Sequence, residues 1–259
     1  MEFVDQLNRK VFLQKTPSRI ISLVPSQTEL LVDLGLRNSL VGITKFCVHP
    51  SNLRSEKVIV GGTKKVNYKK IKSLFPDIII CNKEENTEDM VLQLEKIAPV
   101  WVSDINAIPE CFWMIGQLGE IFQSSENAAE IITKIEIELS DLRKIVQDSK
   151  TRKVLYLIWK DPYMAVGKKT FIDALLHENK FINVIDAELS RYPEIGDKEF
   201  KKADLIFLST EPYPFKNKDA IKMNDIFEAE IKLVDGEYFS WYGSRLIQGI
   251  KYFKTFHKA

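Results

Sequence analysis

The stretch of sequence that decides the fold, residues 19–31, reads RIISLVPSQTELL. An unbroken apolar run ends at Pro25, and Ser26 and Glu29 have the spacing of an S-x-x-E capping box, which predicts a helix start there. A fully apolar strand that enters a helix through a short polar turn is typical of a parallel sheet covered on both faces. Ligands of such sheets lie outside the carboxyl ends of the strands, so Ser26 and Gln27 are the first candidate binding residues.

The same order of elements occurs in both halves of the chain. In the first half, the apolar strand at 20–25 precedes a helix, and a second apolar strand follows at 78–82. In the second half, the apolar runs at 154–159 and 205–209 take the corresponding places. A repeated succession of buried strand and capped helix predicts two similar α/β lobes with parallel sheets, each Rossmann-like.

A long helix is predicted between the two halves. From about 125 to 149, apolar residues recur at helical spacing, and the segment contains no proline or glycine. We therefore expect an N-terminal lobe at 1–123, a single interlobe helix at 124–150 and a C-terminal lobe at 151–259.

Composition restricts the class of protein. The chain of 259 residues carries 37 basic and 36 acidic side chains, without the basic excess of a nucleic-acid-binding domain. No apolar run approaches the ~18 residues of a membrane span, and three scattered cysteines give no disulfide framework. Residues 1–5 hold two acids and no signal-peptide core, so we expect a cytoplasmic monomer with no nucleic-acid partner and no membrane insertion. The alternative, that an export signal has been removed, implies a periplasmic protein or a surface lipoprotein.

The opening motif also carries a family resemblance. Together with DQLNRKV at 5–11 and VGIT at 41–44, it resembles the helical-backbone (TroA-like, class III) substrate-binding proteins. These are the ABC-importer receptors for cobalamin, ferric siderophores and haem, and the resemblance covers nearly the whole chain. It implies a rigid backbone helix, a ligand held in the interlobe cleft and no built-in cofactor. It leaves an ABC permease partner open, because the positions where such receptors present acidic docking residues fall at Lys69 and near Lys198 and Glu199.

Candidate binding residues of the first half follow its predicted strands. Phe46 lies in the loop where the resemblance places a substrate-contacting aromatic residue. Lys64 follows a pair of glycines, and Glu85 follows the strand at 78–82. Cys47 and His49 are two potential metal ligands that would need a third from elsewhere. Each also has a purely structural interpretation as a helix-cap, first-turn or incidental loop residue.

Candidate binding residues of the second half are aromatic side chains and arginines in predicted loops. They are Trp159, Tyr163, Arg191, Trp241, Tyr242 and Arg245. Large aromatic rings beside polar groups suit a flat, hydrophobic ligand, and guanidinium groups pair with ligand carboxylates or phosphates. About half of the rings could instead serve ordinary packing between elements. Arg245 also opens a C-terminal helix, so a purely structural role is the alternative for it.

These patterns favour a binding protein for a metal chelate or corrinoid, meaning a cobalamin-like compound, a ferric siderophore or haem. The sequence contains no G-x-S-x-G elbow, H-E-x-x-H helix or Walker loop, so we expect no catalytic residues. The alternative is a cytosolic chelatase-like or corrinoid- or metal-handling enzyme, in which His49 and Glu84 or Glu85 would move protons.

Overall fold

The computed structural model describes residues 1–257, which form two compact units. Unit 1 comprises residues 1–105, 109–134 and 242–245. Unit 2 comprises residues 106–108, 135–241 and the segment from 246 onward. The chain therefore enters unit 1 again near its C-terminal end, after most of unit 2 is complete.

Unit 1 is built on a parallel sheet of five short strands. These are β3 (Ile20–Ser22), β4 (Leu40–Thr44), β5 (Val58–Gly61), β6 (Ile78–Asn82) and β7 (Val100–Ser103), in the order β5-β4-β3-β6-β7. The strands are apolar along both faces because helices cover the sheet on both sides. A separate antiparallel hairpin pairs β1 (Glu2–Val4) with β2 (Lys10–Phe12).

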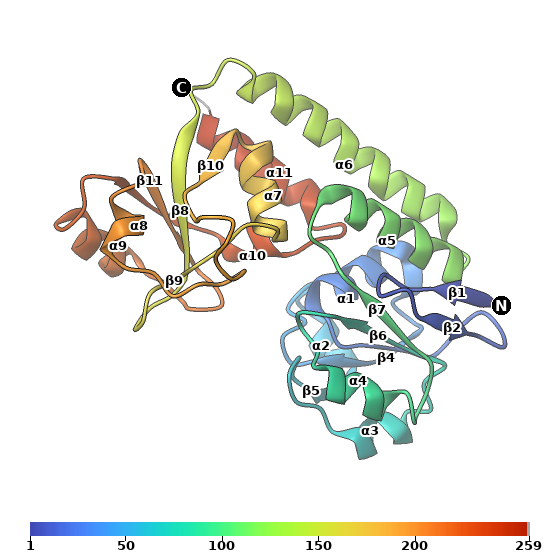
Figure 1. Ribbon diagram of the computed structural model, residues 1–259. Coiled ribbons are helices and arrows are strands. Elements are labelled where there is room, and N and C mark those ends of the chain that lie inside the picture. Colours follow the sequence, from blue (N-terminus) through green and yellow to red (C-terminus); the bar gives the residue numbers. More distant parts are fainter. Residues whose placement is uncertain (258–259) are drawn as a thin grey trace. The chain divides into compact units, whose positions relative to one another are not determined.

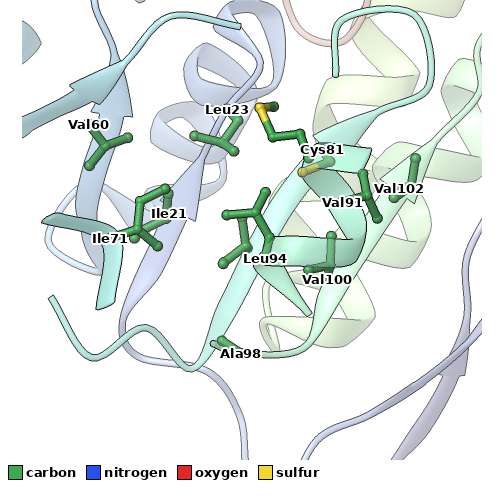
Figure 2. Close-up of a cluster of buried hydrophobic side chains, with 12 residues drawn as sticks. Ile21, Leu23, Val60, Ile71, Cys81, Val91, Leu94, Ala98, Val100 and Val102 are labelled. Atoms are coloured by element: carbon green, nitrogen blue, oxygen red, sulfur yellow. The ribbon is translucent and has the colours of Figure 1, made fainter. Parts of the chain in front are cut away.

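Alternate residues of the strands point to the two faces of this sheet. On one face, Ile21, Cys81 and Val100 pack against α3 (Tyr68–Ser73) and α4 (Glu88–Leu94), as Figure 2 shows. On the other face, Trp101 is fully buried and stacks on Trp113 of α5 (Ile108–Ile121), with ring centroids 6.5 Å apart.

Unit 2 contains a second, mainly parallel sheet. Its strands β8 (Arg152–Trp159), β10 (Phe181–Asn183), β11 (Leu205–Ser209) and β12 (Glu230–Val234) have the order β10-β8-β11-β12. The two-residue strand β9 (Met164–Ala165) pairs antiparallel with β8. One face carries a cluster of aromatic rings in which Tyr156, Phe207 and Phe239 lie with centroids 5.1 to 6.2 Å apart.

The remaining helices connect and cover the strands (Figure 1). In unit 1 they are α1 (Pro25–Leu31), the π-helical turn η1 (Val32–Leu36) and α2 (Leu53–Glu56). In unit 2 they are α7 (Phe171–Glu178), α8 (Asp197–Phe200), α9 (Asn217–Asn224), α10 (Gly236–Ser240), α11 (Leu246–Phe253) and the 3₁₀ turn η2 (Lys254–His257). Thr170 caps α7 by accepting the N–H of Asp173, as a threonine at this position predicts.

The long helix expected from the apolar periodicity is α6 (Ser125–Val146), with 22 residues. Its first part, up to Lys134, belongs to unit 1 and the part from Ile135 to unit 2. The unit boundaries thus lie at other residues than the expected lobe boundaries at 123 and 150. The predicted fold class, α/β with two lobes, parallel sheets and one long helix, is confirmed.

Candidate functional site

Each of the two larger sheets has one topological switch point. At this point the chain has finished adding strands on one side of the first strand and begins to add them on the other side. In unit 1, the chain adds β4 and β5 on one side of β3 and then β6 and β7 on the other. In unit 2, it adds β10 on one side of β8 and then β11 and β12 on the other. Ligands of open α/β sheets bind outside the carboxyl ends of the strands at such points. The candidate residues are therefore those that follow β3 and β6 in unit 1, and β8 and β11 in unit 2.

A buried hydrogen-bond network centred on Gln27 occupies the switch point of unit 1. Gln27 Nε2 donates to Ser103 Oγ and, at 3.1 Å, to the hydroxyl of Tyr242. Asn82 Nδ2 also donates to Ser103 Oγ, at 3.0 Å, and Ser26 hydrogen-bonds the Tyr242 hydroxyl. Burial raises the pKa of Tyr242, so this phenol stays neutral. The structure thus brings the predicted residues Ser26, Gln27 and Tyr242 together.

Gln27 is fully buried, and its Oε1 has no hydrogen-bond partner among residues 1–257. A buried amide oxygen without a donor is costly, and an ordered water commonly supplies one. Because the whole side chain lies out of solvent, Gln27 orients its neighbours Ser103 and Tyr242 and is not itself accessible from the surface.

Glu85 and Lys64 lie at the same edge of the first sheet. Asn82 Oδ1 accepts the backbone N–H groups of Glu84 (2.8 Å) and Glu85 (3.2 Å), which turns the chain after β6, while Lys64 Nζ donates to the carbonyl of Glu84. Burial raises the pKa of Glu85, and the positive charge of Lys64 opposes this shift. Helix α4 begins only at Glu88, so Glu85 lies in the loop and not in a helical first turn.

Phe46 is the exposed aromatic residue of unit 1 at this edge. It follows β4, and 48% of its surface is accessible to solvent. Its ring lies close to Gly62, where an added Cβ would come within 3.1 Å of Phe46 Cε2. The ammonium group of Lys45 lies 5.0 Å from the ring centroid, and the rest of the exposed ring is accessible at the surface.

The predicted capping box of Ser26 and Glu29 is wrong. Helix α1 begins at Pro25 with Val24 as the N-cap, and no side chain caps it. Proline suits this first position because it has no N–H to satisfy and its φ is already helical. Glu29 instead forms an ion pair with Arg245, with Nη2 to Oε1 at 2.7 Å and Nε to Oε2 at 2.9 Å. Arg245 therefore has a structural role, and its contact with a ligand carboxylate stays a prediction.

The predicted metal ligands Cys47 and His49 gain no support from their surroundings. The Cys47 thiol is fully buried and lies 3.1 Å from Thr28 Oγ1 and 3.3 Å from Thr44 Oγ1. Burial raises the pKa of this thiol, whereas a metal ligand must be a thiolate. Within residues 1–257, no three His, Cys, Asp or Glu side chains are placed to hold a metal ion.

An aromatic pair lies at the switch point of unit 2. Trp159 is the last residue of β8 and is 42% exposed, and Tyr213 follows β11. The rings meet edge to face with centroids 5.6 Å apart, and the N–H of Tyr213 donates to the carbonyl of Ile158 at 3.2 Å. This pair provides an apolar surface for a flat ligand. Tyr163 instead packs half-buried against Phe200, at 5.4 Å.

Trp241 and Arg191 are held by polar partners within unit 2. Trp241 is only 8% exposed, and its indole N–H donates to Glu211 Oε1 at 3.1 Å. Arg191 Nη1 donates to Asn106 Oδ1 at 2.6 Å.

The sequence patterns did not predict Asn82, Ser103 or Glu211 as site residues, although each lies at or just after the end of a strand.

Comparisons with known proteins agree with this architecture. Residues 20–229 match the profile of a family described as periplasmic binding protein. An uncharacterized ABC transporter substrate-binding lipoprotein of Bacillus subtilis (strain 168) is 26% identical over 95% of this chain and 82% of its own length. A vitamin B12-binding protein of Vibrio vulnificus (strain CMCP6) is 24% identical over 80% of this chain and 76% of its own. The crystal structure of a petrobactin-binding protein of Bacillus subtilis superposes with a TM-score of 0.85 at 17% identity, and covers 100% of this chain and 99% of that one.

These findings contradict the expected cytoplasmic location. The matched family is described as periplasmic, and the Bacillus subtilis relative is named a lipoprotein, so its members act outside the cytoplasm. The expectation was wrong because it relied on the first residues of the chain. In the part of the chain that the structure describes, no helix is both long and apolar enough to span a membrane.

Proposed function

This chain belongs to the periplasmic binding protein family, and we propose on that basis that it is the substrate-binding component of an ABC importer for a corrinoid or a related metal chelate. The family binds its ligand without chemical conversion, which supports binding over the chelatase-like enzyme. The ligand is cargo and not a resident cofactor.

The observation that carries the ligand class is the pair formed by the exposed Trp159 and the half-buried Tyr213 at the switch point of the second sheet. Trp159 has 42% of its surface accessible at the carboxyl edge of the sheet, where ligands of such folds bind, so its ring offers apolar area for a ligand to cover. Flat, largely apolar macrocycles bind to such rings. Among the possible chelates we favour a corrinoid, because the Vibrio vulnificus relative is named a vitamin B12-binding protein.

The ligand contacts that we propose follow from exposure. Phe46 of unit 1 and Trp159 of unit 2 are proposed as direct ligand contacts, and the better buried Tyr242 and Trp241 as supporting residues. Ser26, Gln27, Lys64, Glu85, Tyr163, Arg191 and Arg245 are proposed as polar or supporting members of the site.

The permease partner is also a proposal. Lys69, on the short helix α3, and Lys198, on α8, are both exposed. A basic docking face would repel a permease surface rich in arginine and attract an acidic one. The permease of this protein should therefore present acidic residues to α3.

Isothermal titration calorimetry with cyanocobalamin, dicyanocobinamide, haemin and ferric petrobactin tests the ligand class. We expect one corrinoid to bind with micromolar or tighter affinity, about −8 kcal/mol. Trp159→Ala should weaken that binding about tenfold or more, since buried aromatic anchors dominate interface energies.

Trp113→Ala is the matched control, because Trp113 is equally exposed (42%) but lies on α5 against Trp101. It should leave the affinity unchanged. Absence of heat with all four compounds would overturn the chelate proposal. Selective binding of haemin or ferric petrobactin would overturn the corrinoid assignment alone.

A further inference from the structure

Glu211 lies at the switch point of unit 2, two residues after β11, and its side chain reaches the end of α10. Glu211 Oε1 accepts two hydrogen bonds, from Ser240 Oγ at 2.8 Å and from Trp241 Nε1 at 3.1 Å. The two donors are consecutive residues. One carboxylate oxygen therefore fixes both the last turn of the helix and the first ring that follows it.

Glu211 is itself held in place. Ser209 Oγ donates to the carbonyl of Glu211 at 2.6 Å, and Tyr156 OH donates to Ser209 Oγ at 3.1 Å. Gly236 allows the close approach of α10, because a Cβ at this position would come within 2.5 Å of Glu211 Cγ. An acceptor that is placed so firmly defines the orientation of its donors.

The backbone of Trp241 is tied as well. Its N–H donates to the carbonyl of Glu237 at 2.9 Å, so the chain direction at the end of α10 is set independently of Glu211. The bond to Glu211 additionally fixes the orientation of the ring, because the indole has a single N–H donor, which lies in the plane of the ring.

We propose that Glu211 is a positioning residue whose carboxylate holds the Trp241 indole in its observed orientation and whose hold on it weakens on protonation. A hydrogen bond to an ionised acceptor is roughly twice as strong as one between neutral groups. Uptake of a proton by Glu211 therefore weakens its hold on both Trp241 and Ser240. The consequence for ligand binding rests on the proposed function, whereas the positioning itself does not.

The groups around Glu211 favour proton uptake. Tyr156 faces it from β8, and Asp235 and Glu237 face it from the start of α10. Burial raises the pKa of Glu211, the negative charges of Glu237 and Asp235 raise it further, and the hydrogen bonds from Ser240 and Trp241 oppose the shift. As the pH falls, Glu211 is protonated earlier than an ordinary glutamate.

Nuclear magnetic resonance of ¹⁵N-tryptophan-labelled protein tests the positioning without any ligand. The chain has four tryptophans, and Trp241→Phe identifies the indole signal of Trp241. In the unmodified protein, we expect this signal to move with pH along one titration curve. In Glu211→Gln, which keeps the shape and removes the charge, the signal should start at a shifted position and lose that titration.

Glu237→Gln is the matched control, since it removes a carboxylate whose charge acts on Glu211 and leaves the bond from the indole to Glu211 in place. It should keep the titration of the Trp241 signal and move its midpoint to lower pH. A Trp241 signal that is the same in Glu211→Gln and the unmodified protein, or that titrates equally in both, would overturn the proposal.

Calorimetry with cyanocobalamin then tests the consequence for the ligand. If the unmodified protein binds it, Glu211→Ala should weaken binding about tenfold, as loss of one hydrogen bond to a charged group predicts. An unchanged affinity would refute the link between Glu211 and ligand binding. If the unmodified protein binds none of the four compounds, the proposed function fails, while the pH titration of the Trp241 signal still decides the positioning.

Discussion

Replacing Arg245 by methionine should destabilise unit 1 strongly, because it breaks a mostly buried ion pair. The side chains of Arg245 and Glu29 are only 10% and 16% exposed, and two contacts of 2.7 and 2.9 Å join them. Removing one partner of a buried pair costs about 3–5 kcal/mol, since the other charge is left buried and uncompensated. Because both side chains keep some contact with solvent, we expect the lower end of the range, about 3 kcal/mol at pH 7.

The loss should depend on pH in a defined direction. Burial raises the pKa of Glu29 in the folded protein above its ordinary 4.5, and Arg245 opposes this shift. A raised pKa gives stability that is present below the unfolded value and is lost as the pH rises through the folded value. Without Arg245 the folded pKa rises further, so the difference in unfolding free energy between variant and unmodified protein should grow from pH 5 to pH 7.

Urea unfolding in a Trp159→Phe, Trp241→Phe background measures this effect, because the remaining tryptophans, Trp101 and Trp113, both lie in unit 1. Arg37→Met is the control, since it breaks the exposed pair with Glu56 and should hardly move the midpoint. Equal effects of Arg245→Met and Arg37→Met, or a loss that does not change with pH, would refute the reasoning.

Two further predictions concern the backbone and the thiols of the described chain. Gly61→Ala should cost about 1–3 kcal/mol and lower the melting temperature, because Gly61 has φ +142° and an added Cβ would lie 2.5 Å from the carbonyl oxygen of Lys65. Gly116 lies in α5, and a Cβ added there would have nothing within 4 Å, so Gly116→Ala should instead stabilise the protein by up to about 1 kcal/mol. Equal losses of unfolding free energy in Gly61→Ala and Gly116→Ala would contradict this. Cys47, Cys81 and Cys111 are free and buried, and burial raises the pKa values of their thiols. Ellman's reagent at pH 8 should therefore react only slowly with the folded protein, whereas in urea it should label all three thiols. Rapid labelling of Cys47 in the folded protein would show that its loop opens.

The fold could be predicted from sequence where local patterns determine it. The apolar runs at 78–82 and 205–209 are β6 and β11, residue for residue, because a buried parallel strand needs an unbroken apolar stretch. Helix α6 was predicted from its apolar periodicity. The capping box failed because Glu29 pairs with Arg245, 216 residues away, and no local pattern reports such a partner.

The sequence could indicate the sheet edge at which the candidate site lies, but it could not indicate all the residues that meet there. Residues after parallel strands could be listed from sequence, which placed Gln27, Glu85 and Trp159 at the sheet edges. Asn82 and Glu211 were missed, because their roles depend on Ser103 and Trp241, which neighbouring strands and helices bring to them. The location was predicted wrongly, since the composition of a folded domain does not encode where the protein resides.

The residues of the proposed site differ in exposure, and this difference suggests two kinds of role. Gln27 and Ser103 are fully buried, so they contribute by fixing Tyr242, and Glu211 does the same for Trp241. Phe46 and Trp159 remain exposed and supply the apolar area that a ligand can cover. Changes in the exposed rings should therefore reduce the affinity for all planar chelates alike. Changes in the buried networks should alter which chelate is preferred, because they change the orientation of the rings that define the shape of the site.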